Sequence, residues 1–124
     1  MLTASLEDYI EALYEIYKEK QGVKAIDIAK RLGVGRSSVT EALKNLASKN
    51  LVNYGRYDVI SLTEEGKEVA LRIIEKHKTL YDFLHNILDI PSNIASDNAC
   101  KMEHIISDEV LDKLVEFIKK QKKD

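Results

Sequence analysis

The hydrophobic pattern of the chain is helical over most of its length. Apolar residues recur at spacings of three and four along three long stretches, from Ser5 to about Lys20, from Thr63 to about Asp89, and from Val110 to Ile118. Such spacing places the apolar side chains on one face of an α-helix, and Ser5, Thr63 and Ser107 have the chemistry of helix N-caps. The only proline, Pro91, is expected to end the second helix. The sequence therefore predicts a mainly α protein.

The stretch from Ala25 to Leu62 follows a different pattern. A short apolar helical face ends at Gly33, a residue suited to a tight turn, and a second amphipathic helix begins between positions 35 and 38. Two short β-type runs follow, Leu51–Tyr54 and Val59–Leu62, and predict a hairpin. This order is typical of a winged helix-turn-helix, in which the second helix reads DNA and the hairpin is the wing.

The polar face of the second helix carries side chains that hydrogen-bond phosphates and base edges. The predicted DNA contacts are Arg36, Ser37, Thr40 and Lys44 on this helix and Arg56 at the tip of the hairpin. The net charge of the whole chain is -2, but the segment from Lys24 to Tyr57 holds seven basic and two acidic residues, a local charge of +5. A basic patch on an acidic body favours a DNA-reading face over the alternative, a small α/β core with a solvated polar helix.

Cys100, Glu103 and His104 stand at spacings of three and four, so on a helix they would project from one face. A thiolate, a carboxylate and an imidazole are all ligands of first-row metal ions. By itself the motif fits equally well a buried cysteine beside a surface ion pair. A catalytic cysteine–histidine pair is less favoured, because no glycine-rich turn presents the thiol and nothing supplies an oxyanion hole.

Three more residues of the same chemistry lie elsewhere. Asp8 and Glu11 are three apart on the first helix, and His77 lies on the apolar side of the long helix. Alone, each has an ordinary explanation as a solvated acid or a core histidine. Together they make a stronger case, because carboxylates packed close together repel one another and a bound cation removes that cost. The six predicted metal ligands are Asp8, Glu11, His77, Cys100, Glu103 and His104.

The last helix carries more apolar positions than a terminal helix needs for its own small domain, and this predicts a helical dimer interface. We expect two domains, residues 1–70 as the winged helix-turn-helix and residues 71–124 as a helical metal-binding and dimerisation domain. The single cysteine excludes an intrachain disulfide and suits a reducing cytoplasm. No apolar run resembles a signal peptide or a membrane span, so the expected location is the cytoplasm.

Taken together, these residues resemble the diphtheria toxin repressor and manganese transport regulator family of metal-activated repressors, in its short two-domain form. The resemblance covers nearly the whole chain. It is carried by residues 6–11 (LEDYIE), residues 37–40 (SSVT), residues 62–66 (LTEEG), His77, and residues 99–110 (ACKMEHIISDEV).

The resemblance implies a homodimer that reads DNA with its N-terminal domain, dimerises through its C-terminal helices and binds metal between the domains. It implies repression of metal-uptake genes, no enzymatic activity, and metal-ligand roles for the six residues named above. Asp8 and Glu11 are similar to the manganese branch of the family, whereas Cys100 is similar to the iron branch. Tyr81 and Ser96 stand where the iron branch has ligands of a second site, which puts that site in doubt.

The expected cofactor is Mn(II) or Fe(II), with Co(II), Ni(II) or Zn(II) as ions that the same ligands would accept. The metal would fix two reading helices about one DNA turn apart, which matches a palindromic operator in double-stranded DNA. No membrane and no small-molecule substrate is expected. The alternatives are a winged-helix regulator that does not sense metal, a metal-dependent enzyme, and a dimeric module whose hairpin contacts another protein.

Overall fold

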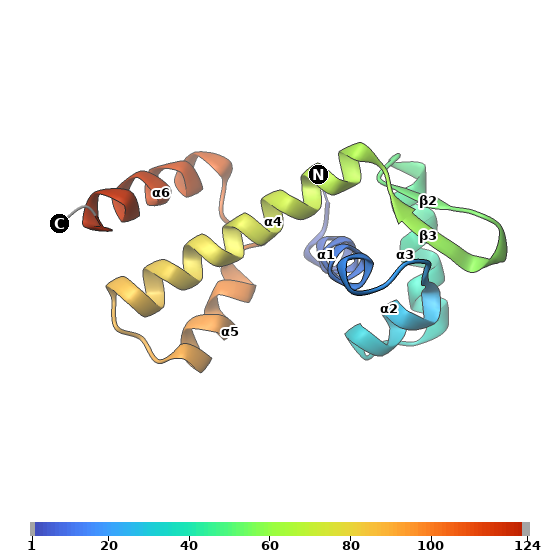
Figure 1. The fold of residues 1–124 in the computed structure, drawn as a ribbon, viewed down its shortest axis with the longest axis horizontal. Coiled ribbons are helices and arrows are strands. Elements are labelled where there is room, and N and C mark those ends of the chain that lie inside the picture. The colour runs from blue at the N-terminus through green and yellow to red at the C-terminus, as the bar shows by residue number, and fades with distance from the viewer. Residues whose placement is uncertain (1, 123–124) are drawn as a thin grey trace. The chain divides into compact units, whose positions relative to one another are not determined.

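The computed structural model describes residues 2–122, apart from the side chain of Arg56, and the chain divides into two compact units, Met1–Leu71 and Arg72–Asp124 (Figure 1). The long helix α4 (Glu64–Asp82) contributes residues to both units. No helix within the described residues combines the length and the apolar character needed to cross a bilayer.

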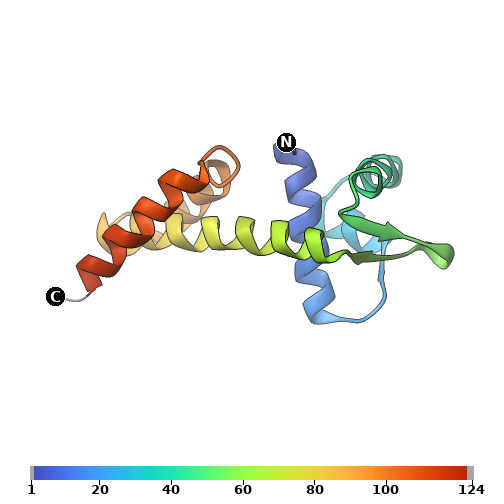
Figure 2. The ribbon, with the colours of Figure 1, turned by 90° about the horizontal axis from the view of Figure 1, so that it is seen from above.

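The first unit is a helix-turn-helix with a small antiparallel sheet. Its elements before α4 are α1 (Ala4–Glu19), β1 (Val23–Lys24), α2 (Ala25–Leu32), α3 (Arg36–Ser48), β2 (Val52–Tyr54), a 3-10 turn η1 (Arg56–Asp58) and β3 (Val59–Leu62). The strand order is β1-β3-β2, with Val23 opposite Ile60 and Val52 opposite Leu62. Figures 1 and 2 both show the hairpin of β2 and β3 projecting from the helices of this unit.

The turn between α2 and α3 is made by a left-handed residue. Gly33 has φ of 66°, a conformation that glycine adopts without strain, and its N–H donates to the carbonyl of Ala29. Helix α3 then begins at Arg36 with Gly35 in the N-cap position, the earlier of the two starts that the sequence allowed. The predicted helix, glycine turn and second helix are therefore present.

One prediction in this unit was wrong in detail, and one short strand was missed. Helix α1 is capped by Thr3, whose Oγ1 accepts a hydrogen bond of 3.1 Å from the N–H of Leu6, so Ser5 lies inside the helix rather than at its cap. Strand β1 was not predicted, because two residues are too short to show an alternating pattern. It exists only through its pairing with β3.

The core of the first unit is built from all of its helices and strands. The fully buried side chains include Ile10 and Leu13 from α1, Ile28 from α2, and Leu43 and Leu46 from α3. The central residues of the sheet, Val23, Val52 and Ile60, are also buried. The apolar stripe predicted for α3 therefore faces the core.

The second unit contains the C-terminal part of α4, a π-helical segment η2 (Phe83–Ile87), α5 (Ser92–Met102) and α6 (Asp108–Lys122). The capping predictions hold at two helices: Thr63 Oγ1 accepts from the N–H of Gly66 at 3.0 Å, and Ser107 Oγ accepts from the N–H of Val110 at 3.2 Å. The fold class is confirmed as mainly α with an N-terminal winged helix-turn-helix followed by C-terminal helices.

Candidate functional site

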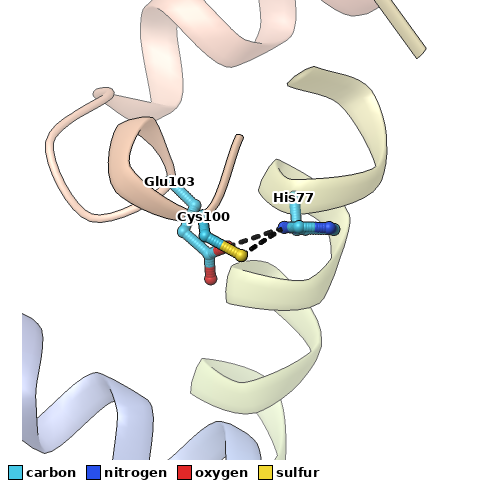
Figure 3. Close-up of side chains that lie close together, drawn as sticks. All are labelled: His77, Cys100 and Glu103. Carbon is cyan, nitrogen blue, oxygen red and sulfur yellow. Dashed lines mark hydrogen bonds and ion pairs between the residues drawn. The ribbon is translucent and has the colours of Figure 1, made fainter. Parts of the chain in front are cut away.

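Three of the predicted metal ligands meet in the second unit. His77 projects from α4 towards Cys100 and Glu103 at the C-terminal end of α5 (Figure 3). His77 Nδ1 lies 2.9 Å from Glu103 Oε1 and 3.7 Å from Cys100 Sγ. One ligand atom from each residue lies within 4.8 Å of the other two. Side chains from two helices, more than twenty positions apart in the sequence, thus converge on one point.

The end of α5 decides which side chains reach this point. Glu103 is the C-cap and keeps helical dihedral angles, with φ of -59° and ψ of -27°, so it remains one turn beyond Cys100 on the same face. Helix α5 ends at Met102, and residues 103–105 form a turn in which the N–H groups of Ile105 and Ile106 both donate to the carbonyl of Met102. His104 therefore lies in this turn rather than in a regular helix, and its role as a metal ligand stays a prediction.

The cluster combines exposed and buried donors. Glu103 is 1% exposed and is the only buried charged side chain in the part of the chain that the structure describes. Cys100 is exposed, and the side chain of His77 is 26% exposed. A buried carboxylate is costly unless a donor or a cation faces it, and here the ring of His77 does. The cluster therefore places a buried carboxyl group directly against an imidazole ring and beside an exposed thiol.

The geometry fits a transition-metal ion. Nitrogen, oxygen and sulfur ligands bind such ions at about 2.0–2.3 Å, which keeps neighbouring ligand atoms about 3–4 Å apart. The separations of 2.9 Å and 3.7 Å match this spacing. A donor set of one sulfur, one nitrogen and one oxygen suits Fe(II), Co(II) or Zn(II) better than Mg²⁺ or Ca²⁺, which prefer oxygen alone. Three ligands also leave coordination positions open for further groups.

Charged residues next to the cluster hold the turn that follows it. Lys76, the neighbour of His77, donates to the carbonyl of Ile106 at 2.9 Å. Arg72 contacts Asp108 at 3.0 Å and Asp112 at 3.1 Å, so α4 is tied to the start of α6. The hydrogen bond from Arg72 lowers the pKa of Asp108, against a smaller opposing effect of burial. These contacts fix the chain that follows Glu103.

Asp8 and Glu11 lie on α1, in the first unit. Asp8 is exposed and Glu11 is half-buried. They stand three apart, so they share one side of the helix, as the sequence indicated. Their role as metal ligands stays a prediction.

The predicted DNA contacts also lie in the first unit. Arg36, Ser37 and Lys44 are exposed on α3, on the side away from its buried stripe, and Thr40 is half-buried. Thr40 Oγ1 donates to the carbonyl of Arg36 at 3.1 Å, so its hydroxyl proton is used within the helix. The side chain of Arg56 lies outside the described residues.

Sequence reasoning missed two residues that position these groups. Asp58 Oδ2 accepts from the guanidinium of Arg36 at 2.8 Å, and Lys76 holds the carbonyl of Ile106. The partners are 22 and 30 residues apart, so neither contact has a local pattern. For Asp58, the sequence offered one indication only: its carboxylate lies at the tip of a hairpin that follows the proposed reading helix.

Comparison with known sequences assigns both halves of the chain to one family. Residues 1–60 match "Iron dependent repressor, N-terminal DNA binding domain", and residues 63–124 match "Iron dependent repressor, metal binding and dimerisation domain". An uncharacterized HTH-type transcriptional regulator of Methanocaldococcus jannaschii is 42% identical over 122 residues, which cover 98% of each chain. The HTH-type transcriptional regulator MntR of Bacillus pumilus is 32% identical over 118 residues, 95% of this chain and 81% of that protein.

Solved structures of similar proteins have the same fold. The manganese regulator SloR superposes with a TM-score of 0.80 at 27% identity, over 92% of this chain and 53% of that one. A manganese-dependent transcriptional repressor in complex with manganese gives 0.81 at 27% identity, over 91% and 52%. A hypothetical protein of Sulfolobus solfataricus gives 0.78 at 27% identity, over 96% and 91%. The chain thus spans about half the length of the first two. It belongs to the iron-dependent repressor family, the diphtheria toxin repressor and manganese transport regulator family of metal-dependent transcriptional repressors.

Proposed function

We propose that this protein represses transcription when Mn(II) or Fe(II) binds at the cluster of His77, Cys100 and Glu103. The observation that carries this proposal is the convergence of three different ligand atoms within 4.8 Å around a carboxylate that is 1% exposed. A bound divalent ion supplies the positive charge that such a buried carboxylate needs. Its presence would therefore stabilise the packing of α4 against the end of α5.

The donors of the cluster have separate roles. His77 and Glu103 fix the site between two helices, and the exposed Cys100 supplies the soft ligand that draws the preference towards Fe(II), Co(II) or Zn(II). Asp8, Glu11 and His104 are proposed from the sequence as further ligands. The two hard carboxylates among them favour Mn(II). The soft and hard ligands therefore favour different ions, and the relative affinities for Mn(II) and Fe(II) show which of them the site prefers.

We also propose that α3 reads DNA and that the protein acts as a homodimer on a palindromic operator of metal-uptake genes. The exposed residues Arg36, Ser37 and Lys44, with Thr40 beside them and Arg56 in the wing, supply the contacts. Two reading heads related by a twofold axis require half-sites about one DNA turn apart. The division of roles between residues 1–70 and 71–124 belongs to the same proposal.

The test is DNA binding by chelator-stripped protein, followed by fluorescence anisotropy on duplexes selected from a random pool by the metal-loaded protein. We expect Mn(II) or anaerobic Fe(II) to raise the affinity of the wild type by about 5- to 150-fold, the usual range of coupling between two sites. His77→Ala and Glu103→Gln should abolish this increase. His85→Gln is the matched control, because His85 lies in the same unit and contacts the carbonyl of Ile90 rather than the cluster.

Two results would contradict the proposal. DNA binding that is equally tight with and without metal would favour the alternative, a winged-helix regulator that senses something else. A metal response that survives in both cluster variants would place the sensing site elsewhere in the chain.

A further inference from the structure

Asp58 at the tip of the wing joins two other elements of the first unit. Its Oδ2 accepts from the guanidinium of Arg36, at the first position of α3, over 2.8 Å. Its Oδ1 accepts from the hydroxyl of Tyr54, at the end of β2, over 3.0 Å. One carboxylate therefore connects the hairpin to the first residue of the proposed reading helix.

The backbone that presents this carboxylate is strained. Tyr57 and Asp58 both have φ of 63°, in the left-handed region. Two consecutive residues with positive φ are typical of type I′ turns, where Asn-Gly is the preferred pair. Tyr57 is 87% exposed, so burial of its ring does not compensate for the strain. Such conformations persist where surrounding contacts determine them, often at functional sites.

The contact between Asp58 and Arg36 adds little to stability or to DNA affinity. The side chain of Arg36 is 61% exposed and that of Asp58 is 27% exposed, and exposed ion pairs contribute little to folding. A negative charge beside a DNA-reading face also weakens the attraction to phosphates, which is the sequence-independent part of binding. What the contact does achieve is to fix the orientation of the guanidinium.

We propose that Asp58, supported by Tyr54, is a positioning residue that orients Arg36 for a base-specific contact and so sets the base preference of the reading head. The guanidinium is a rigid planar group with five N–H donors, and its contact with Asp58 uses only one of its nitrogens. The rest of the plane suits the O6 and N7 atoms of a guanine, the commonest specific partner of arginine. This inference rests on the proposed function, in which α3 reads DNA.

The experiment measures base preference rather than affinity alone. Full-length protein loaded with Mn(II) is allowed to bind a random pool of DNA duplexes, and the bound fraction is sequenced. Asp58→Asn removes the charge but keeps the size of the side chain and its tolerance of positive φ, so the turn should survive. We expect it to reduce the preference at one base position of each half-site, by up to the roughly 5- to 150-fold that a bidentate contact supplies. Affinity for mixed-sequence DNA should stay the same or rise.

Three further variants locate the effect. Arg36→Lys keeps the charge but loses the planar fork, so it should lose preference at the same base position, and adding Asp58→Asn should cause no further loss. Tyr54→Phe removes one hydrogen bond and should give a smaller change there. Glu68→Gln, an equal change of charge at an exposed residue of α4, should leave the base preference unchanged.

The outcomes separate the two proposals. If Asp58→Asn selects the same motif as the wild type, the orienting role is wrong, and a uniform gain in affinity would show that Asp58 acts only through its charge. If the wild type selects no motif, or Arg36→Lys keeps every base preference, the reading role of this end of α3 is wrong as well.

Discussion

The two compact units hold their shape in different ways. In the first unit, side chains from α1, α2, α3 and all three strands bury one another in a single apolar cluster. Ion pairs are also present in the first unit, where Arg31 of α2 contacts Glu15 and Glu19 of α1. In the second unit, fewer apolar side chains are buried, among them Leu80 and Leu111, so the charged contacts between its helices should matter more for its stability. These contacts join Arg72 to Asp108 and Asp112, and Lys122 to Asp82.

This difference should affect how each unit responds to ions. Burial of carbon surface does not depend on charge, so the apolar core of the first unit should be little affected by added ions. Salt screens charged contacts, so the stability of the second unit should depend more on ionic strength.

The largest effect should come from the core of the first unit. Leu43 is 0% exposed, so Leu43→Ala should lower the free energy of unfolding by about 2–5 kcal/mol through lost burial and a cavity. Urea unfolding of the metal-free protein measures this, and hydrogen exchange should place the loss in the first unit. Leu71→Ala, at a side chain 51% exposed, is the control and should change stability by less than about 0.5 kcal/mol. A loss that depends on salt would contradict this account of the first unit.

A smaller effect should follow from cutting the charged contacts of the second unit. Arg72→Met keeps most of the apolar stem and removes the contacts with Asp108 and Asp112, whose side chains are 67% and 66% exposed. Because solvent screens such pairs, we expect a loss of only about 1 kcal/mol in the free energy of unfolding. The loss should shrink in 1 M NaCl (a concentration at which the Debye length is about 3 Å).

The control for this variant is Lys113→Met, which removes a 3.8 Å pair with Glu116 on the same helix and should have almost no effect. If Arg72→Met cost as much as Leu43→Ala, or lost the same stability at every salt concentration, the two units would not differ as described.

The smallest effect should appear in acid. The hydrogen bond from Arg72 holds the pKa of Asp108 below its ordinary value, and burial opposes this only in part. When the pKa is lower in the folded state, the carboxylate stabilises that state fully at any pH above the pKa of the unfolded chain, about 3.9. This contribution disappears as the pH falls through the lower pKa of the folded state. At neutral pH the Asp108→Asn variant should therefore be less stable than the wild type, and the loss should be smaller than that caused by Arg72→Met. Once Asp108 of the wild type is protonated, the variant and the wild type should be equally stable.

Urea unfolding at pH 7 and at stepwise lower pH measures this difference, which should shrink as Asp108 becomes protonated. In the Arg72→Met background the substitution Asp108→Asn should have a smaller effect, since only the contact with Lys76 at 3.4 Å remains. A difference that persisted in strong acid would assign the role of Asp108 to packing rather than to its charge.

Much of the fold followed from local pattern. The apolar stripe of α3, the left-handed turn at Gly33 and the caps Thr63 and Ser107 were all readable, because each depends on residues within one or two helical turns. The end of α5 was not. Nothing in the sequence of residues 103–106 would stop a helix. The turn that follows α5 is nevertheless closed by hydrogen bonds from the N–H groups of Ile105 and Ile106 to the carbonyl of Met102.

The metal site was predicted as a set of residues, not as an arrangement. The chemistry of Cys100, Glu103 and His104 was visible in their spacing, and among the described residues Cys100 and Glu103 join His77 in the cluster. The spacing assumed a continuous helix, whereas α5 ends at Met102 and His104 lies in the turn that follows. The burial of Glu103 could not be predicted either, because it depends on segments far away in the sequence, among them the part of α4 that brings His77 to its carboxylate.

The sequence by itself determined the order of the main helices and of the hairpin strands, the basic residues of α3 and the ligand chemistry of His77, Cys100 and Glu103, because periodicity, caps and side-chain chemistry are local properties. Only the tertiary structure decided that His77 meets residues 23 and 26 positions away, that β1 exists, and that Asp58 holds Arg36. These are contacts between distant segments, and they are set by how the chain packs and pairs rather than by any pattern along it.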